Sequence, residues 1–188
     1  EWDGVAAIDA GHYDIMALYA NGRLLLPTNG VPAYGVSDLV DVAAGFWHCL
    51  GLRANGTLTA WGDRAYDGET SIPINLGTVV DVAAGMRFSA ALKADGTVRV
   101  WGANYYGQTN VPPGLTNVVA IDAGLNFVVA LRADGTVTAW GYNGSGQTNV
   151  PAGLTDVVAI DAGGATVLAL RADGSVVSWG WGAATPPA

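Results

Sequence analysis

The sequence predicts an all-β protein: a β-propeller of five repeats, each a blade of four antiparallel strands, closed into a five-bladed ring. One observation behind this prediction is an internal repeat of about 39 residues that runs through the 188-residue chain. A repeat of this length is typical of solenoids, propellers and arrays. The other is that each repeat consists of short apolar runs separated by turn residues, which favours short strands in radially repeated sheets.

The composition indicates a folded domain with an acidic surface. Hydrophobic residues make up 51% of the chain and charged residues only 13%, which is too apolar a balance for a disordered segment. The formal net charge of −8 repels phosphate groups, so we do not expect a nucleic-acid partner. No apolar run approaches the roughly 18 residues that a membrane-spanning helix needs, so we expect no membrane insertion.

An Ala-Gly pair follows an apolar run in every repeat and aligns the five copies. The glycines of these pairs are Gly11, Gly45, Gly85, Gly124 and Gly163. Because each unit can bury its apolar faces only against its neighbours, we expect one domain over residues 1–188. Its units cover about 1–38, 39–78, 79–117, 118–156 and 157–188.

The most regular units show where the strands lie. We expect strands at Val128–Arg132, Thr136–Trp140, Thr148–Pro151 and Val157–Asp161. The first of these is apolar at nearly every position, as expected of a strand buried on both faces between neighbouring blades. An Ala-Asp-Gly triplet at 133–135 follows it, and every unit has such a triplet with Asn or Asp in the middle. In these hairpin turns we expect both central residues to take positive φ.

The first and last units depart from the others. Unit one has Pro27-Thr28 where the other units have Trp-Gly. The C-terminal Thr185–Pro187 could supply the missing strand of the first blade, and such closure would remove an exposed sheet edge. We therefore expect a closed, monomeric ring. The alternative is a piece of a longer array that self-association completes as a homo-oligomer.

A recurrent motif follows the Trp-Gly pairs and is clearest at Gly102–Gln108 (GANYYGQ) and Gly141–Gln147 (GYNGSGQ). With the Asp-Gly turns, it makes the whole chain resemble the regulator of chromosome condensation repeat family. The Thr-x-Val-Pro after each Gln is most similar to secreted bacterial members, including β-lactamase inhibitor protein II. The resemblance implies a β-propeller from a secreted or cell-surface bacterial protein, although the best-known members have seven blades.

Two kinds of loop should share one side of the blades, here called the loop face: the turns after the Ala-Gly pairs and the loops after the Trp-Gly pairs. These segments differ between blades and are rich in the side chains that are enriched at interface centres. The candidate binding residues are His12, Tyr13, Phe46, Trp47, Arg64, Tyr66, Met86, Arg87, Tyr105, Tyr106, Asn126 and Tyr142. The resemblance points to the same face, because aromatic residues at these positions of the β-lactamase inhibitor contact the enzyme. The alternative for Phe46 and Met86 is that they turn inward.

The opposite face carries charges at one repeat position, beside the hairpin turns. These are Arg53, Lys93, Arg132 and Arg171. We interpret them as solvated charges that shield the hairpin ends, and a ring of cations that grips an anion is the alternative. The tryptophans of the Trp-Gly pairs also recur at one position, and we expect them to pack between blades. They are Trp61, Trp101, Trp140 and Trp179.

Candidate catalytic residues are few, and each has a structural interpretation. His48 stands where a histidine is usual in the resembling family, although a contact with Asp14 is possible, and Cys49 begins an apolar strand. One aspartate recurs in the apolar run before each Ala-Gly pair: Asp9, Asp41, Asp81, Asp122 and Asp161. A hydrolase could pair such carboxylates, but one per blade is more simply a hydrogen-bonding group. No metal-binding spacing is present, and we expect no cofactor.

These observations predict a non-enzymatic binding module. It presents an aromatic-rich loop face to a protein, which it could inhibit, or to a glycan. One alternative is a structural repeat module of a larger secreted or surface protein. The other is a carboxylate-based hydrolase, which would need a deep pocket and a strongly shifted pKa within it.

Overall fold

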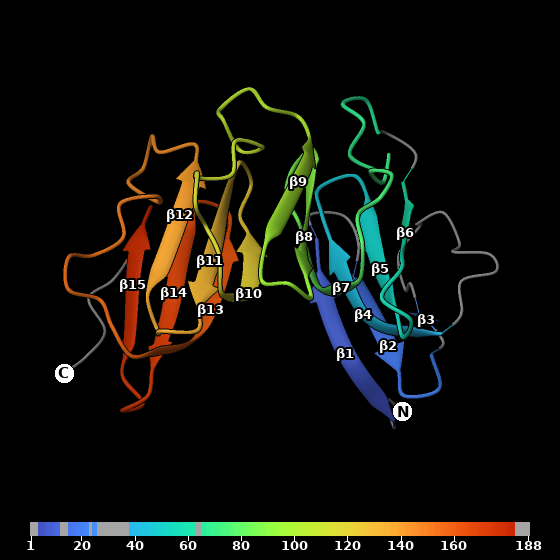
Figure 1. The fold of residues 1–188 in the computed structure, drawn as a ribbon, viewed down its shortest axis with the longest axis horizontal. Coiled ribbons are helices and arrows are strands. Elements are labelled where there is room, and N and C mark those ends of the chain that lie inside the picture. The colour runs from blue at the N-terminus through green and yellow to red at the C-terminus, as the bar shows by residue number, and fades with distance from the viewer. Residues whose placement is uncertain (1–3, 12–14, 23, 26–37, 63–64, 183–188) are drawn as a thin grey trace.

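The computed structural model describes residues 4–11, 15–22, 24–25, 38–62 and 65–182, which form five antiparallel sheets. The sheets follow one another in chain order, from the first (blue, right) through the third (green, centre) to the fifth (red, left) in Figure 1. Within these ranges no helix is long and apolar enough to cross a membrane. The all-β fold of radially repeated sheets is the predicted propeller architecture.

Each described sheet has its strands side by side in chain order. The first three sheets contain β1 (Val5–Ala10), β2 (Ile15–Tyr19) and β3 (Leu24–Leu25); β4 (Leu39–Ala44), β5 (Cys49–Arg53) and β6 (Leu58–Trp61); and β7 (Val79–Ala84), β8 (Phe88–Lys93) and β9 (Val98–Gly102). The last two contain β10 (Val118–Ala123), β11 (Phe127–Arg132) and β12 (Val137–Gly141); and β13 (Val157–Gly163), β14 (Thr166–Arg171) and β15 (Val176–Gly180). We call each sheet a blade.

The described blades have three strands each, so the prediction of four-stranded blades is wrong. The expected strand at Thr148–Pro151 is not formed. Its backbone is held locally instead, because Thr148 N donates to Asn143 Oδ1 and Val150 N donates to the Thr148 carbonyl. Pro151 has no N–H to donate to a ladder, which disfavours a strand at this position.

The hairpin turns also differ from the prediction, because only their glycines take positive φ. Gly56 has a φ of 78°, whereas Asn55 is not among the residues with positive φ. Gly56 N donates to the Arg53 carbonyl and Arg53 N donates to the Thr57 carbonyl, which makes a three-residue loop with a bulge at glycine. Asn55 Oδ1 accepts hydrogen bonds from Thr57 N and Oγ1 at 3.0 and 2.7 Å. The Asn or Asp is therefore selected for its side-chain oxygen, and Asp95, Asp134 and Asp173 repeat this contact.

The core consists of apolar layers between successive blades. Alternate residues of β11 face opposite neighbours: Val128 and Ala130 pack with the third blade, whereas Val129 and Leu131 pack with the fifth. The middle strand is thus buried on both faces, as its apolar sequence predicts.

The repeated tryptophans join neighbouring blades, which supports the packing role predicted for them. The indole N–H of Trp140, in the fourth blade, donates to the carbonyl of Gln108 at 2.9 Å, and Gln108 lies in the loop that follows the third blade. Trp101 and Trp179 make the equivalent bonds to the carbonyls of Glu69 and Gln147. All three indoles are buried, so each satisfies its polar group within an apolar layer.

Closure of the blades into a ring is not confirmed. The first and fifth blades lie at opposite ends of the series in Figure 1, and Ile8 and Leu168 on their outward sides remain exposed. The segments predicted to seal the ring, around Pro27-Thr28 and at 185–187, lie outside the described residues.

Candidate functional site

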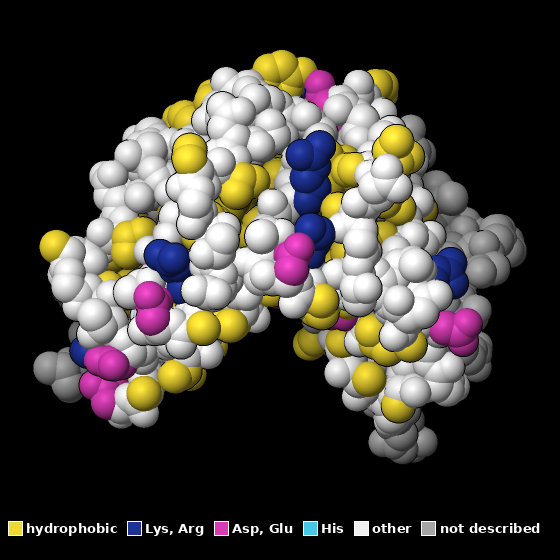
Figure 2. All heavy atoms as spheres, in the orientation of Figure 1, with side chains coloured by type: hydrophobic (Ala, Val, Ile, Leu, Met, Phe, Trp, Pro, Cys, Tyr) yellow, Lys and Arg dark blue, Asp and Glu magenta, His cyan; other side chains and the backbone are white. Residues whose placement is uncertain are grey.

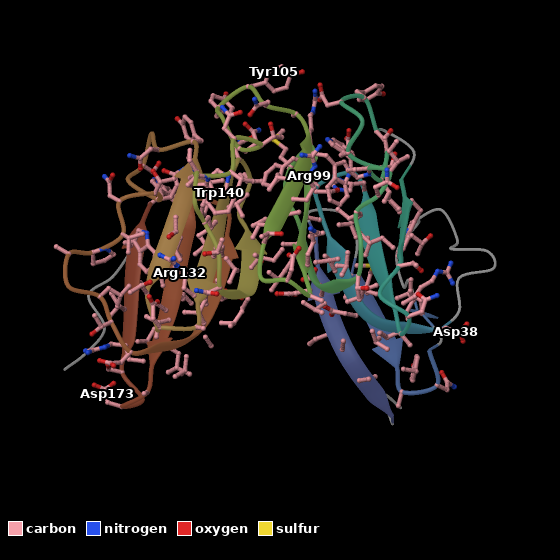
Figure 3. The ribbon with its side chains drawn as sticks, in the orientation of Figure 1. Asp38, Arg99, Tyr105, Arg132, Trp140 and Asp173 are labelled. Atoms are coloured by element: carbon pink, nitrogen blue, oxygen red, sulfur yellow. The ribbon has the colours of Figure 1, made fainter. Side chains whose placement is uncertain are left out.

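The two faces predicted from strand order are separate in the structure. Figure 2 shows an upper edge that is mainly hydrophobic and uncharged, with one acidic side chain, and more charged groups lower down. Tyr105, which follows a Trp-Gly pair, lies at the upper edge in Figure 3, whereas Asp38 and Asp173 lie towards the lower edge. The loop face is therefore the aromatic face, and the hairpin turns form the charged one.

Three segments of the loop face meet around Asp67. Tyr105 Oη donates to Asp67 Oδ1 at 2.5 Å, and Arg87 Nη1 lies 3.3 Å from Asp67 Oδ2. The Arg87 guanidinium carbon is 6.0 Å from the centre of the Tyr66 ring, within reach of a cation–π interaction. The hydrogen bond to the Asp67 carboxylate raises the pKa of Tyr105 above its ordinary value, so the phenol stays protonated. We call Tyr66, Asp67, Arg87 and Tyr105 the Asp67 cluster.

Buried side chains hold the loops of this face in place. Glu69 is fully buried and accepts a hydrogen bond from Asp67 N at 2.9 Å. Its carbonyl accepts from Trp101 Nε1 and from Ser89 Oγ, both at 2.8 Å. Gln108 fills the same place in the next loop and accepts from Tyr106 N at 2.8 Å. The loops are therefore organised before any ligand arrives, which lowers the cost of ordering them on binding.

Two aromatic pairs extend the face. The rings of Tyr106 and Tyr142, from the loops of the third and fourth blades, have centres 4.8 Å apart and are tilted by 59°. Phe46 and Trp47 meet edge to face at 4.9 Å in the second blade. The tyrosine pair is exposed, so with the Asp67 cluster it places aromatic side chains along three successive loops.

A cavity of about 310 Å³ lies at the centre, where the inner strands of all five described blades converge. Phe46, Met86 and Leu125 line it, together with alanines and glycines of the Ala-Gly pairs. Their place in the cavity lining favours the alternative that Phe46 and Met86 turn inward, away from the exposed residues of the loop face.

The remaining predicted residues fall into two groups. Asn126 is half-buried, and its carbonyl accepts a hydrogen bond from Tyr142 N at 2.9 Å, which supports the loop. His12, Tyr13 and Arg64 lie outside the described residues. Sequence reasoning did not select Asp67 or Glu69. The available signal was that Glu69 stands where Gln108 and Gln147 stand in the later units.

The recurrent aspartates join neighbouring blades through backbone amides. Asp9 Oδ2 accepts from Ala44 N at 2.6 Å, and Asp122 Oδ2 accepts from Ala162 N at 2.6 Å. Asp81 Oδ2 accepts from Ile121 N at 3.0 Å. In each case the donor belongs to the next blade. These contacts support the structural interpretation of the aspartates over a hydrolase pair.

Burial controls the ionisation of these carboxyls. It raises the pKa of Asp122 to about 7 and that of Asp81 to about 6, against the opposing effect of the amide donors. The pKa values of Asp9 and Asp41 are raised by burial as well. These shifts follow from loss of hydration and need no catalytic explanation.

The His48 environment does not form a nucleophile. His48 Nε2 lies 2.8 Å from Ser89 Oγ, and the serine hydroxyl donates to the Glu69 carbonyl at 2.8 Å, so the histidine is the donor in this chain. His48, Ser89 and Cys49 are all buried, and burial lowers the pKa of His48 to about 4. Asp14 lies outside the described residues. Within the described part of the chain, no three potential metal ligands come together.

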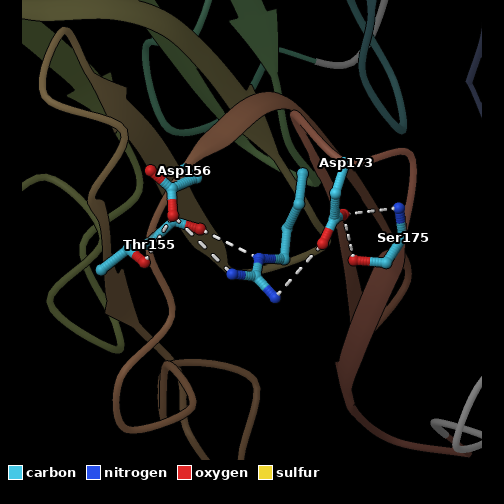
Figure 4. Close-up of polar contacts among 5 residues, drawn as sticks. Thr155, Asp156, Asp173 and Ser175 are labelled. Carbon is cyan, nitrogen blue, oxygen red and sulfur yellow. Dashed lines mark hydrogen bonds and ion pairs between the residues drawn. The ribbon is translucent and has the colours of Figure 1, made fainter.

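The cations of the opposite face are held by local partners. Arg171 lies 3.7 Å from Asp156 and 3.8 Å from Asp173, and its Nε donates to the Thr155 carbonyl at 3.1 Å (Figure 4). Lys93 Nζ lies 2.9 Å from Asp95 Oδ2. This pairing favours the interpretation as charges that shield the hairpin ends over a ring that grips an anion.

Comparisons with known proteins identify the repeats. The regulator of chromosome condensation (RCC1) repeat matches residues 39–67, 79–108 and 118–147. A search of curated proteins finds no match. The finer resemblance to secreted bacterial inhibitors is not confirmed.

Solved structures with the same fold are distant in sequence. The ectodomain of the Physcomitrella patens receptor kinase CR4 is 23% identical with a TM-score of 0.80, over 96% of this chain and 53% of that one. The CRINKLY WD40 ectodomain from the Arabidopsis thaliana receptor kinase ACR4 is 19% identical, with a TM-score of 0.75 over 96% and 65%. Prp20p from Saccharomyces cerevisiae is 22% identical, with a TM-score of 0.75 over 93% and 56%. This chain thus spans about half to two thirds of the length of these proteins.

Proposed function

Because the chain is an RCC1-repeat protein, we propose that it is a non-enzymatic module that binds another protein through its loop face. The observation that carries this proposal is the Asp67 cluster, in which side chains from separate loops form one exposed and internally bonded patch. Tyr and Arg are the residues most often found at energetic centres of protein interfaces. Their fixed positions allow a partner to bind without ordering the loops first.

Two further observations support a protein partner. Prp20p, which has the same fold, binds Gsp1p and histones, and both are proteins. The patch is also nearly neutral, since Arg87 is paired with Asp67, so recognition would depend on aromatic contact area and hydroxyl hydrogen bonds. The strongly charged groups lie on the opposite face and would stay solvated.

The test is a capture experiment with point variants. Wild type, Tyr106→Ala and Trp47→Ala are immobilised and exposed to an extract of the source cells and to their culture medium, and bound proteins are quantified by mass spectrometry. We expect a set of proteins retained by wild type and depleted about tenfold by Tyr106→Ala, the loss typical of an interface hot spot. Arg132→Ala is the matched control, because Arg132 adjoins the hairpin turn of the fourth blade, where Gly135 N donates to its carbonyl, and this variant should retain the same set.

Two outcomes would contradict the proposal. Equal capture by wild type and both loop-face variants would show that the face is wrong. Loss of capture by Arg132→Ala alone would move the site to the charged face. Circular dichroism of each variant checks that the fold is kept, which we expect for Tyr106→Ala because Tyr106 is exposed and its truncation removes little core packing.

Finer forms of the proposal concern the partner and the place of action. The partner could be an enzyme that the loop face inhibits, and assays of a captured enzyme with and without the module test this form. Aromatic side chains also stack on sugars, so binding to a glycan array with loss in Tyr106→Ala would replace the protein partner by a glycan. Two proteins of the same fold are receptor ectodomains, which supports a secreted or cell-surface location for this chain.

A further inference from the structure

The contacts between successive blades are made by residues at equivalent positions of the repeat. Each blade has a forward flank, which packs on the next blade, and a backward flank, which packs on the preceding one. In the contact between the fourth and fifth blades, Val129 and Leu131 form the forward flank, whereas Val167 and Ala169 form the backward flank. Both sides are apolar and closely buried.

The forward flank of the fifth blade keeps this chemistry but is exposed within the described part of the chain. Leu168 and Leu170 stand 39 residues after Val129 and Leu131, at the same positions of the repeat. Their exposed fractions are 41% and 38%, whereas those of Val129 and Leu131 are 0% and 3%. A contiguous apolar sheet face in water favours association with another surface.

The backward flank of the first blade is uncovered in the same way. Ile8 and Ile15 stand 113 residues before Ile121 and Val128, which pack against the third blade. Their exposed fractions are 74% and 49%, against 6% and 0% in the fourth blade. The first blade therefore carries the apolar surface that a fifth-blade forward flank would normally meet.

The polar groups of the two flanks also correspond. Asp161 occupies the position of Asp122, whose carboxylate accepts the amide of Ala162 in the next blade. The counterpart of Ala162 in the first blade is Ala10, an exposed residue whose amide donates to Asp9 Oδ1 at 2.8 Å and would share or exchange this bond in a contact with the fifth blade. The Gly135 carbonyl likewise accepts from Val157 N, and the counterparts of these two groups are the Gly174 carbonyl and Val5 N. Acceptors on the fifth blade thus correspond to donors on the first.

From this correspondence we propose that the chain associates head to tail, with the fifth blade of one copy packed against the first blade of a second copy. The new contact continues the series of contacts already present between the blades. The chain's own first blade is a less suitable occupant, since the outward flanks of the described first and fifth blades stay exposed even though their inner strands line the same cavity. Because the two surfaces differ, the association is heterologous and uses one flank from each copy.

The experiment is a measurement of mass in solution with flank variants. Leu170→Arg blocks the forward flank and Ile8→Arg blocks the backward flank, and both residues are exposed, so neither change disrupts the core. Val119→Arg is the matched control, because Val119 is 54% exposed in β10 but lies on neither terminal flank. We expect the average mass of wild type and of the control to rise above one chain with concentration, whereas each flank variant stays at one chain.

Mixing the two flank variants gives the decisive result. Leu170→Arg keeps a free backward flank and Ile8→Arg keeps a free forward flank, so their mixture should form a species of two chains and no more. Asp161→Asn should weaken the association of wild type about tenfold, because one charge-assisted hydrogen bond is lost. A wild type that stays at one chain at all concentrations, or a mixture that stays monomeric, would overturn the proposal. Equal association by both single variants and wild type would do so as well.

Discussion

The buried carboxyl of Asp122 should make the protein more stable in mild acid than at alkaline pH. Its pKa is about 7 in the folded protein, mainly because burial disfavours the charged form, and 3.8 without that burial. The folded state therefore holds the proton more tightly than the unfolded state between these values. Protonation favours folding: its contribution is complete below about pH 4 and is lost as the pH rises through about 7.

The magnitude follows from the two pKa values. One pKa unit corresponds to about 1.4 kcal/mol, so raising the pH from 5 to 8 should remove about 3 kcal/mol of stability through Asp122. Asp81, with a pKa of about 6, should remove about 1 kcal/mol over the same interval. His48 opposes this loss: burial lowers its pKa from 6.5 to about 4, so its unfolded imidazole is protonated at pH 5, and raising the pH to 8 should add about 2 kcal/mol of stability. With a slope of about 2 kcal/mol per M of urea, the net loss of about 2 kcal/mol should lower the unfolding midpoint by about 1 M.

The assay is urea unfolding followed by tryptophan fluorescence at several pH values between 5 and 8. The perturbation is Asp122→Asn, which cannot ionise; its stability should rise by about 1 kcal/mol from pH 5 to 8, because the gain through His48 exceeds the loss through Asp81. Asp122→Asn should also lower stability at pH 5, because its side-chain amide has one acceptor oxygen in place of two. That oxygen can accept from Ala123 N or from Ala162 N, and the amide NH2 group then faces the other backbone N–H. Asp95→Asn is the control: its carboxyl is exposed and has a pKa of about 2, so it titrates below the interval.

The reasoning would be refuted by equal pH slopes in wild type and Asp122→Asn, or by a wild-type midpoint that rises from pH 5 to 8. A flattened slope in Asp95→Asn would also count against it, since the effect would then arise from surface charge in general.

Three further predictions test other contacts. Gly124→Ala should lower stability by about 1–3 kcal/mol, because its new Cβ would lie 2.0 Å from Phe127 Cε1, whereas Gly163→Ala at the same repeat position has nothing within 4 Å and should be nearly neutral in thermal unfolding. Trp140→Phe leaves the Gln108 carbonyl without its indole donor and should cost about 1–3 kcal/mol, whereas exposed Trp181→Phe should leave the melting temperature unchanged. Asp67→Asn should lower the pKa of Tyr105 towards its ordinary value, because the carboxylate that raises it is gone; an unchanged ultraviolet titration of the phenol would contradict the contact.

Much of the loop face followed from the repeat. The period placed Tyr66, Arg87 and Tyr105 in loops of one side, and the structure brings these three together around Asp67. Tyr106 and Tyr142 also meet, as members of neighbouring loops. Phe46 and Met86 belong to the same loops but line the central cavity, because their turns lie at the inner ends of the blades. Sequence position alone did not distinguish the side chains that are exposed on the loop face from those that point into the central cavity.

The sequence by itself determined the repeat, the apolar middle strands and the separation of an aromatic face from a charged one. These features depend on periodicity, which places equivalent residues in equivalent environments. Only the tertiary structure decided that Asp122 accepts a hydrogen bond from Ala162 N of the next blade and that Asp67 contacts side chains from other loops of the loop face. It also decided that Thr148–Pro151 is not a strand and that the outward flanks at Ile8 and Leu170 are uncovered. The physical reason is that these contacts depend on the angle and spacing between whole blades, and the period within one unit does not encode either quantity.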